Sequence, residues 1–183
     1  MMGMMEIMTG AGLYLVGVFG VFGFFGIYVF GHVAAARTGK RDPNLGIKVL
    51  LTFLLTVAFQ ATFNGLVAIV VGAIMGTNVK VALALMLAGV VSMIAPGLLY
   101  IGPRKTGSYP VGRKALGLNA AISGLLATVA TFAIFQMFFA KGVSGKAVAS
   151  VAVALVLHLG VFLGMGIAVL KSKPEESGPA PAA

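Results

Sequence analysis

The chain has no cysteine and only four acidic residues among 183. Without cysteine it has no disulfide framework, no thiolate metal site and no cysteine nucleophile. The four carboxylates, Glu6, Asp42, Glu175 and Glu176, all lie in predicted loops or tails. No carboxylate is therefore placed within an apolar run to carry a proton or to act with a second one as general acid and base. On these grounds we expect no enzymatic activity, no cofactor and no metal site.

Histidine is also scarce, with His32 and His158 as the two examples. A shared haem or metal would need both at one depth, but His32 lies near the end of the first apolar run and His158 near the middle of the last. Their offset along a helix is on the order of 10–15 Å. We expect His158 to be a neutral imidazole that is hydrogen-bonded to a hydroxyl or amide on the second, third or fourth run. A ligand-contacting or pH-sensing role is the alternative.

Apolar residues make up 60% of the chain and gather in five long runs. Each run is long enough for a transmembrane helix, which requires about 20 residues. The predicted spans are 11–34, 49–75, 81–101, 115–140 and 147–170. We therefore predict an all-α, polytopic integral membrane helix bundle. It forms one transmembrane domain over residues 1–173, followed by a disordered cytoplasmic tail over residues 174–183.

A cleaved signal peptide is the alternative for the first run, since Ala34-Ala35-Ala36 is typical of a cleavage site. No Lys or Arg precedes this run, however, and its apolar stretch is longer than that of an ordinary signal peptide. We therefore expect it to remain as a span.

Basic residues outnumber acidic ones by thirteen to four. Ten of the thirteen, Lys48 among them, fall after the first, third and fifth spans, and only Lys80, Lys141 and Lys146 fall on the opposite side. Short basic loops are retained in the cytoplasm, so we expect the N-terminus outside and the C-terminus inside, in a plasma membrane such as a bacterial inner membrane. Because the charges flank membrane spans, we expect anionic lipid and no nucleic acid as their partner. The expected headgroup or partner contacts are Arg37, Lys40, Arg41, Arg104, Lys105, Arg113 and Lys114.

Glycine recurs at every third position of the first span, at Gly17, Gly20, Gly23 and Gly26. A three-residue step lays these positions along an inclined groove of a helix, and the bare backbone there allows a neighbouring helix to approach closely. We therefore predict helix packing at this row and at a second row in the last span, Gly160 and Gly164. An aromatic wall for a lipid, quinone or pigment is the alternative for the first row, since each of its glycines is followed two positions later by an aromatic residue.

Small and polar residues recur at four-residue steps in the other spans. Residues four apart share a helix face, so these stripes are expected to face neighbouring helices rather than lipid. The residues expected to form interhelical hydrogen bonds or to line a polar path are Thr52, Thr56, Gln60, Asn64, Asn119, Ser123, Thr131 and His158. The corresponding stripe of the third span is Ala84, Ala88, Ser92, Pro96 and Tyr100.

The stripes also indicate an internal repeat. A shift of 66 residues places Lys48 on Lys114 and Lys80 on Lys146, and a shift of 67 aligns the stripe of the second span with that of the fourth. A duplication would give two helical hairpins of the same orientation behind an added first helix.

Two functional classes fit this pattern. The first is a non-enzymatic, oligomeric or accessory subunit of a membrane complex, with copies of itself or other membrane subunits as partners. The second is a channel or transporter for a small solute, with a neutral polar path between the duplicated hairpins. We prefer the first class because small and polar residues at helix interfaces are ordinary packing devices in membranes.

Overall fold

The computed structural model describes residues 2–105 and 109–172, and the predicted tail over residues 174–183 lies outside this part of the chain. Its elements are α1 (Met2–Thr38), α2 (Leu45–Met75), α3 (Lys80–Tyr100), the 3-10 turn η1 (Pro103–Lys105), α4 (Val111–Phe139) and α5 (Gly145–Lys171). No strand occurs within those two ranges. Each of the five α-helices contains a segment long and apolar enough to cross a membrane, which confirms the predicted all-α bundle of five spans.

The lengths of the helices follow from their surroundings. In hydrocarbon every backbone N–H and C=O must bond within the protein, so long apolar runs form helices. The shortest of the five, α3, has 21 residues, which span about 30 Å, the thickness of the hydrocarbon core. Glycines with left-handed backbone, Gly39 (φ 69°) and Gly76 (φ 70°), follow the last residues of α1 and α2. Such glycines commonly end helices because they lack a Cβ.

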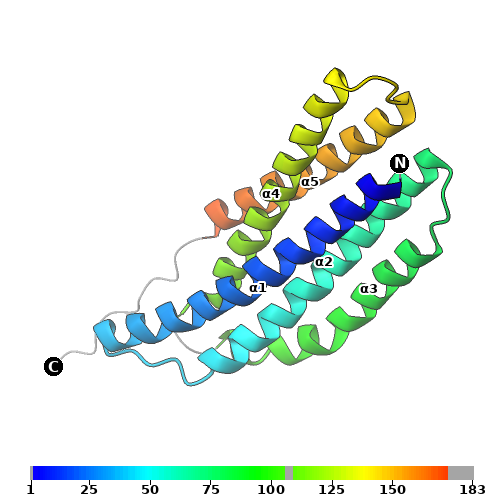
Figure 1. Ribbon diagram of the computed structural model, residues 1–183. Coiled ribbons are helices and arrows are strands. Elements are labelled where there is room, and N and C mark those ends of the chain that lie inside the picture. Colours follow the sequence, from blue (N-terminus) through cyan, green and yellow to red (C-terminus); the bar gives the residue numbers. More distant parts are fainter. Residues whose placement is uncertain (1, 106–108, 173–183) are drawn as a thin grey trace.

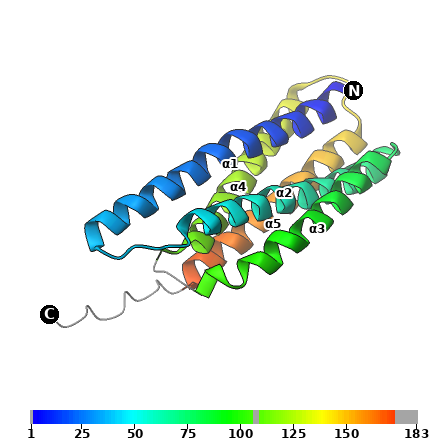
Figure 2. The same ribbon diagram turned by 90° about the horizontal axis from the view of Figure 1, so that it is seen from below.

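The helices form two hairpins and one added helix (Figure 1). α2 packs mainly on α3 and α4 mainly on α5, while α1 lies against α2 and α4 (Figures 1 and 2). The turns within the hairpins lie at the same end of the bundle as the start of α1. Segments 39–44 and 101–105 and the last turn of α5 lie at the other end. This second end carries the basic segments, and its cytoplasmic location stays a prediction.

The two hairpins have the same direction and similar spacing. α4 begins 66 residues after α2, and α5 begins 65 residues after α3. α2 and α4 are parallel, because Leu45 shares an apolar cluster with Val111 near the start of both helices, and Gln60 meets Asn119 further along. This is the arrangement that a duplication would produce, although a common origin of the hairpins stays a prediction.

Among the residues that the structure describes, the apolar core is divided into three clusters, and a polar layer lies between two of them. The first cluster joins α1, α2 and α4 around Phe24 and Val49. The second joins α2 to α5 around Phe63 and Ala154, and the third lies within the α4–α5 hairpin. Along α2, the buried polar residues Thr52, Thr56 and Gln60 lie between Val49 of the first cluster and Phe63 of the second.

Candidate functional site

Four of the predicted polar residues form a hydrogen-bonded chain between α2 and α4. The Asn119 amide donates from Nδ2 to the Thr56 hydroxyl at 2.9 Å, and Gln60 donates from Nε2 to Asn119 Oδ1 at 3.0 Å. Asn64 extends the chain along α2, since its Nδ2 donates to the backbone carbonyl of Gln60 at 2.8 Å. Thr56, Gln60 and Asn119 are buried. The chain therefore joins two helices inside the bundle.

Two further predicted residues satisfy their hydroxyls within their own helices. Thr52 donates to the backbone carbonyl of Lys48 at 2.7 Å, and Thr131 donates to that of Ala127 at 2.9 Å. Threonine commonly bonds the carbonyl four residues back when it lies within a helix. Neither residue joins the chain of amides.

Ser123 and His158 are the remaining members of the predicted set, and they are 0% and 4% exposed. Neither Ser123 Oγ nor His158 Nδ1 has a hydrogen-bond partner among the residues that the structure describes. The His158 ring instead meets Phe63 edge to face, with the ring centroids 5.1 Å apart. The expected hydrogen bond from His158 to a hydroxyl or amide is therefore wrong for Nδ1. Most buried polar groups are satisfied, so these two atoms are exceptions.

These two side chains lie at the depth of the amide chain. Ser123 is four residues beyond Asn119, about one turn further along the same face of α4. His158 reaches from α5 to Phe63, which immediately precedes Asn64 on α2. Because α2, α4 and α5 all contact one another, amide, hydroxyl and imidazole groups come from three mutually packed helices.

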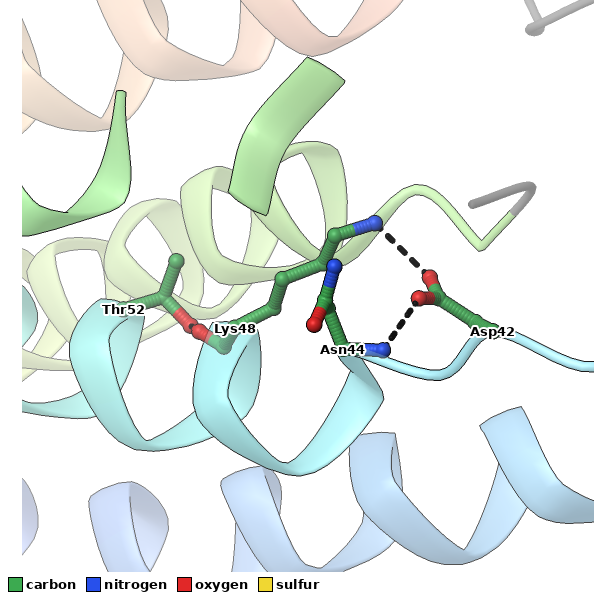
Figure 3. Close-up of polar contacts among 4 residues, drawn as sticks. All are labelled: Asp42, Asn44, Lys48 and Thr52. Carbon is green, nitrogen blue, oxygen red and sulfur yellow. Dashed lines mark hydrogen bonds and ion pairs between the residues drawn. The ribbon is translucent and has the colours of Figure 1, made fainter. Parts of the chain in front are cut away.

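A buried ion pair lies at the start of α2 (Figure 3). Lys48 Nζ is 2.7 Å from Asp42 Oδ2, and both side chains are 3% exposed. The other carboxylate oxygen of Asp42 accepts from the backbone N–H of Asn44 at 3.0 Å, which fixes the entry to the helix. The charge pattern assigns Lys48 to the basic loop after the first span, but the structure places it within α2. The available signal was an acidic residue two positions before the helix cap and a lysine one turn after it.

The predicted headgroup contacts occupy the end of the bundle that holds segments 39–44 and 101–105 (Figure 1). Arg37, Arg41, Lys105 and Lys114 are exposed, whereas Lys40 and Arg113 are half-buried. The side chain of Arg104 lies outside the described part of the structure. Tyr109, at the same end, packs against the first apolar cluster, the one around Phe24 and Val49. Burial raises the pKa of its phenol.

The glycine row of α1 is covered only in part. A Cβ built at Gly23 would lie 2.7 Å from Leu118 Cδ1 of α4, and one at Gly20 would lie 3.6 Å from the Phe53 ring of α2. At Gly17 and Gly26 the described chain places nothing within 4 Å of such a Cβ. The structure therefore packs two members of the row against other helices of the bundle and leaves two uncovered.

The glycine row of α5 faces outward. A Cβ built at Gly160 or Gly164 meets nothing within 4 Å in the described chain, and both residues are exposed together with Ala168. Phe162, between the two glycines, packs on α4, since its ring lies 3.0 Å from a Cβ built at Gly124. Residues two positions apart point about 200° apart around a helix. Gly160 and Gly164 therefore face away from α4.

Two glycines lie where the backbones of α2 and α3 approach each other closely. A Cβ built at Gly65 would lie 2.6 Å from the backbone N of Met86, and one at Gly89 would lie 2.6 Å from the backbone N of Thr62. Neither glycine belongs to the predicted rows. Glycine itself was the available signal, because in membrane helices small residues mark places where backbones meet.

The stripe predicted for the third span is buried only at its end. Ala84, Ala88 and Ser92 are exposed, Tyr100 is half-buried, and Pro96 is buried together with Gly89, which the stripe did not include. Gly89 and Pro96 are seven residues apart and so share a helix face.

No protein-family model matches the chain, and no curated protein or solved structure matches it. The functional argument therefore rests on the chemistry of the residues described above. Within residues 2–105 and 109–172 no three His, Asp or Glu side chains gather in a way that could hold a metal ion. The arrangement offers hydrogen bonds that join helices, glycine faces that can admit a further helix, and two buried polar atoms that can bind a small molecule.

Proposed function

We propose that the protein is a non-enzymatic subunit of a membrane complex and that it assembles with a second copy of itself through the outer face of α5. The observation that carries this proposal is the uncovered row Gly160, Gly164 and Ala168. Small residues at four-residue steps allow two transmembrane helices to pack backbone to backbone.

The use of glycine inside the bundle supports this reading. Gly65 and Gly89 lie where the backbones of α2 and α3 approach each other closely, so the chain uses glycine to bring helices together. Lipid gives no comparable packing to a bare backbone, and glycine is less favourable than alanine within a helix. A row of glycines that faces away from its own bundle is accounted for by a further helix on that side.

A second copy is the occupant that best fits this face. The row repeats the spacing that pairs identical transmembrane helices, and a two-fold axis beside α5 would set Gly160 and Gly164 against the same residues of the partner. His158 and Phe162 point to the inner side of α5 and would keep their contacts. The buried hydrogen bonds between Gln60, Asn119 and Thr56 support a packed interior, because they consume the amides that a hydrated path would expose.

The test is the oligomeric state of a variant that carries both Gly160→Leu and Gly164→Leu. We expect chemical cross-linking in proteoliposomes to give a dimer of the wild-type chain and a large loss of that dimer in the variant. Gly117→Leu is the matched control, because its Cβ also meets nothing within 4 Å of the described chain but lies on α4. An unchanged dimer in the double variant would contradict the proposal.

A path for a small uncharged solute is the second candidate, and the unpartnered atoms of Ser123 and His158 favour it. If the hydrogen-bonded chain of Thr56, Gln60, Asn64 and Asn119 lines such a path, Asn64→Leu should change solute flux into proteoliposomes while leaving the melting temperature unaffected. If that chain serves packing, the same variant should lower stability and leave flux at background level.

A further inference from the structure

Ser123 Oγ and His158 Nδ1 are buried polar atoms that bond to nothing in the described chain. A buried polar atom without a partner is unfavourable, and in folded proteins such atoms are usually paired with protein or with an ordered small molecule. We infer that Ser123 and His158 form a buried binding site, at the junction of α2, α4 and α5, for one small uncharged molecule that both donates and accepts hydrogen bonds. Water is the smallest such molecule.

The chemistry of the two side chains defines the ligand. A serine hydroxyl can donate or accept, and imidazole Nδ1 accepts or donates according to the tautomer. A molecule that bridges them must therefore offer both functions. No Asp, Glu, Lys or Arg occurs in segments 49–79, 115–140 or 147–170, so a charged ligand at this depth would lack a counter-charge.

Residues around the two side chains fix their positions. The Phe63 ring lies edge to face with the His158 ring, at an interplanar angle of 84°, and so limits its rotation. Asn119, one turn before Ser123, is held by its bonds to Gln60 and Thr56. The ring beside His158 is thus apolar, and the amide one turn before Ser123 already has its partners. If no molecule binds at this site, the proposed self-assembly is unaffected, because Gly160 and Gly164 face away from α4.

Thermal unfolding of the full chain in detergent tests the site through the direction in which Ser123→Ala shifts the melting temperature. If a molecule is bound, Ser123→Ala removes a hydrogen bond and should lower the melting temperature by roughly 2–4 °C. If the hydroxyl has no partner of any kind, its removal should leave that temperature unchanged or raise it, which would overturn the inference. Ser150→Ala is the matched control, since Ser150 is also buried but donates within its own helix to the carbonyl of Lys146 at 2.8 Å.

A second variant shows whether one ligand joins the two residues. His158→Phe keeps an aromatic ring beside Phe63 but removes both ring nitrogens. When His158→Phe is already present, Ser123→Ala should lower the melting temperature much less than it does alone, because the shared ligand has already been lost. Equal effects of Ser123→Ala in both backgrounds would contradict a shared ligand.

Radiolytic footprinting in water enriched in ¹⁸O distinguishes a resident water from another small molecule. An exchanging water at the site should label Phe63 faster than Phe24, which is buried in the apolar cluster of α1, α2 and α4. The label on Phe63 should disappear in the variant that carries both Ser123→Ala and His158→Phe. A loss of melting temperature without labelling of Phe63 assigns the site to another small neutral molecule. If neither the loss of melting temperature nor the labelling of Phe63 is observed, no molecule is bound and the inference fails.

Discussion

The packing of α2 on α3 predicts that Gly89→Ala destabilises the bundle. The new methyl group would collide with Thr62 Oγ1 and would lie 2.6 Å from the Thr62 backbone N and 2.7 Å from the Ala58 carbonyl oxygen. The same place holds the hydrogen bond from the Thr62 hydroxyl to the Ala58 carbonyl at 2.9 Å. Two of these atoms belong to the backbone of α2 and cannot rotate away. α3 must therefore move off α2.

The magnitude follows from what each added methyl group would meet. Overpacking a filled interior destabilises by about 1–3 kcal/mol, and we expect Gly89→Ala to lie in the upper half of that range because backbone atoms are involved. At Gly23 the obstacle is only the end of the Leu118 side chain, so Gly23→Ala should destabilise less. At Gly97 the nearest atom is Leu55 Cδ2 at 3.8 Å, an ordinary contact, so Gly97→Ala should not destabilise.

Circular dichroism at 222 nm, followed during heating in one detergent, gives the comparison. Gly89→Ala should lower the melting temperature by roughly 5–10 °C, and Gly97→Ala is the control for any gain in helix propensity on the same helix. The geometry of the α2–α3 contact would be refuted if the two variants melted at the same temperature.

The polar network, the ion pair and the charge pattern give three more predictions. Asn119→Leu breaks the link between α2 and α4 and should lower stability by about 0.6–2 kcal/mol in the same melting assay, whereas no change would show that the link is weak. Lys48→Met leaves the buried Asp42 carboxylate unpaired and should destabilise by about 3–5 kcal/mol, and adding Asp42→Asn should recover most of this loss. If the second change recovers nothing, the pair is not what makes Lys48 important. A reporter fused after Ser177 should be cytoplasmic and one placed before Thr9 should be outside, and two ends on one side would contradict five spans.

The architecture could be predicted from the sequence because it depends on long-range averages. Spans follow from the length of apolar runs, and their number does not depend on any single residue. The hydrogen bond between Gln60 and Asn119 could be predicted for a related reason. Their amides are costly to leave unpaired in hydrocarbon, and a four-residue stripe places them on helix faces that meet. Their pairing across α2 and α4 also follows from the parallel direction of the two hairpins.

Contacts between particular glycines could not be predicted in the same way. The chain has 26 glycines, and in helices that are apolar all round the sequence does not distinguish the lipid-facing side from the protein-facing side. Gly65 and Gly89 meet α3 and α2 only because the hairpin folds with one particular rotation of each helix. The Asp42–Lys48 pair was missed for a local reason, since α2 begins four residues earlier than its apolar run indicates and carries Lys48 into the interior.

The mass of the intact assembly tests the proposed self-association most directly. Native mass spectrometry of the full chain, released from lipid nanodiscs, should give a species of twice the 18.7 kDa of one chain. The Gly160→Leu and Gly164→Leu double variant should give the single chain under the same conditions. A wild-type protein found only as the single chain of 18.7 kDa would contradict assembly through the outer face of α5.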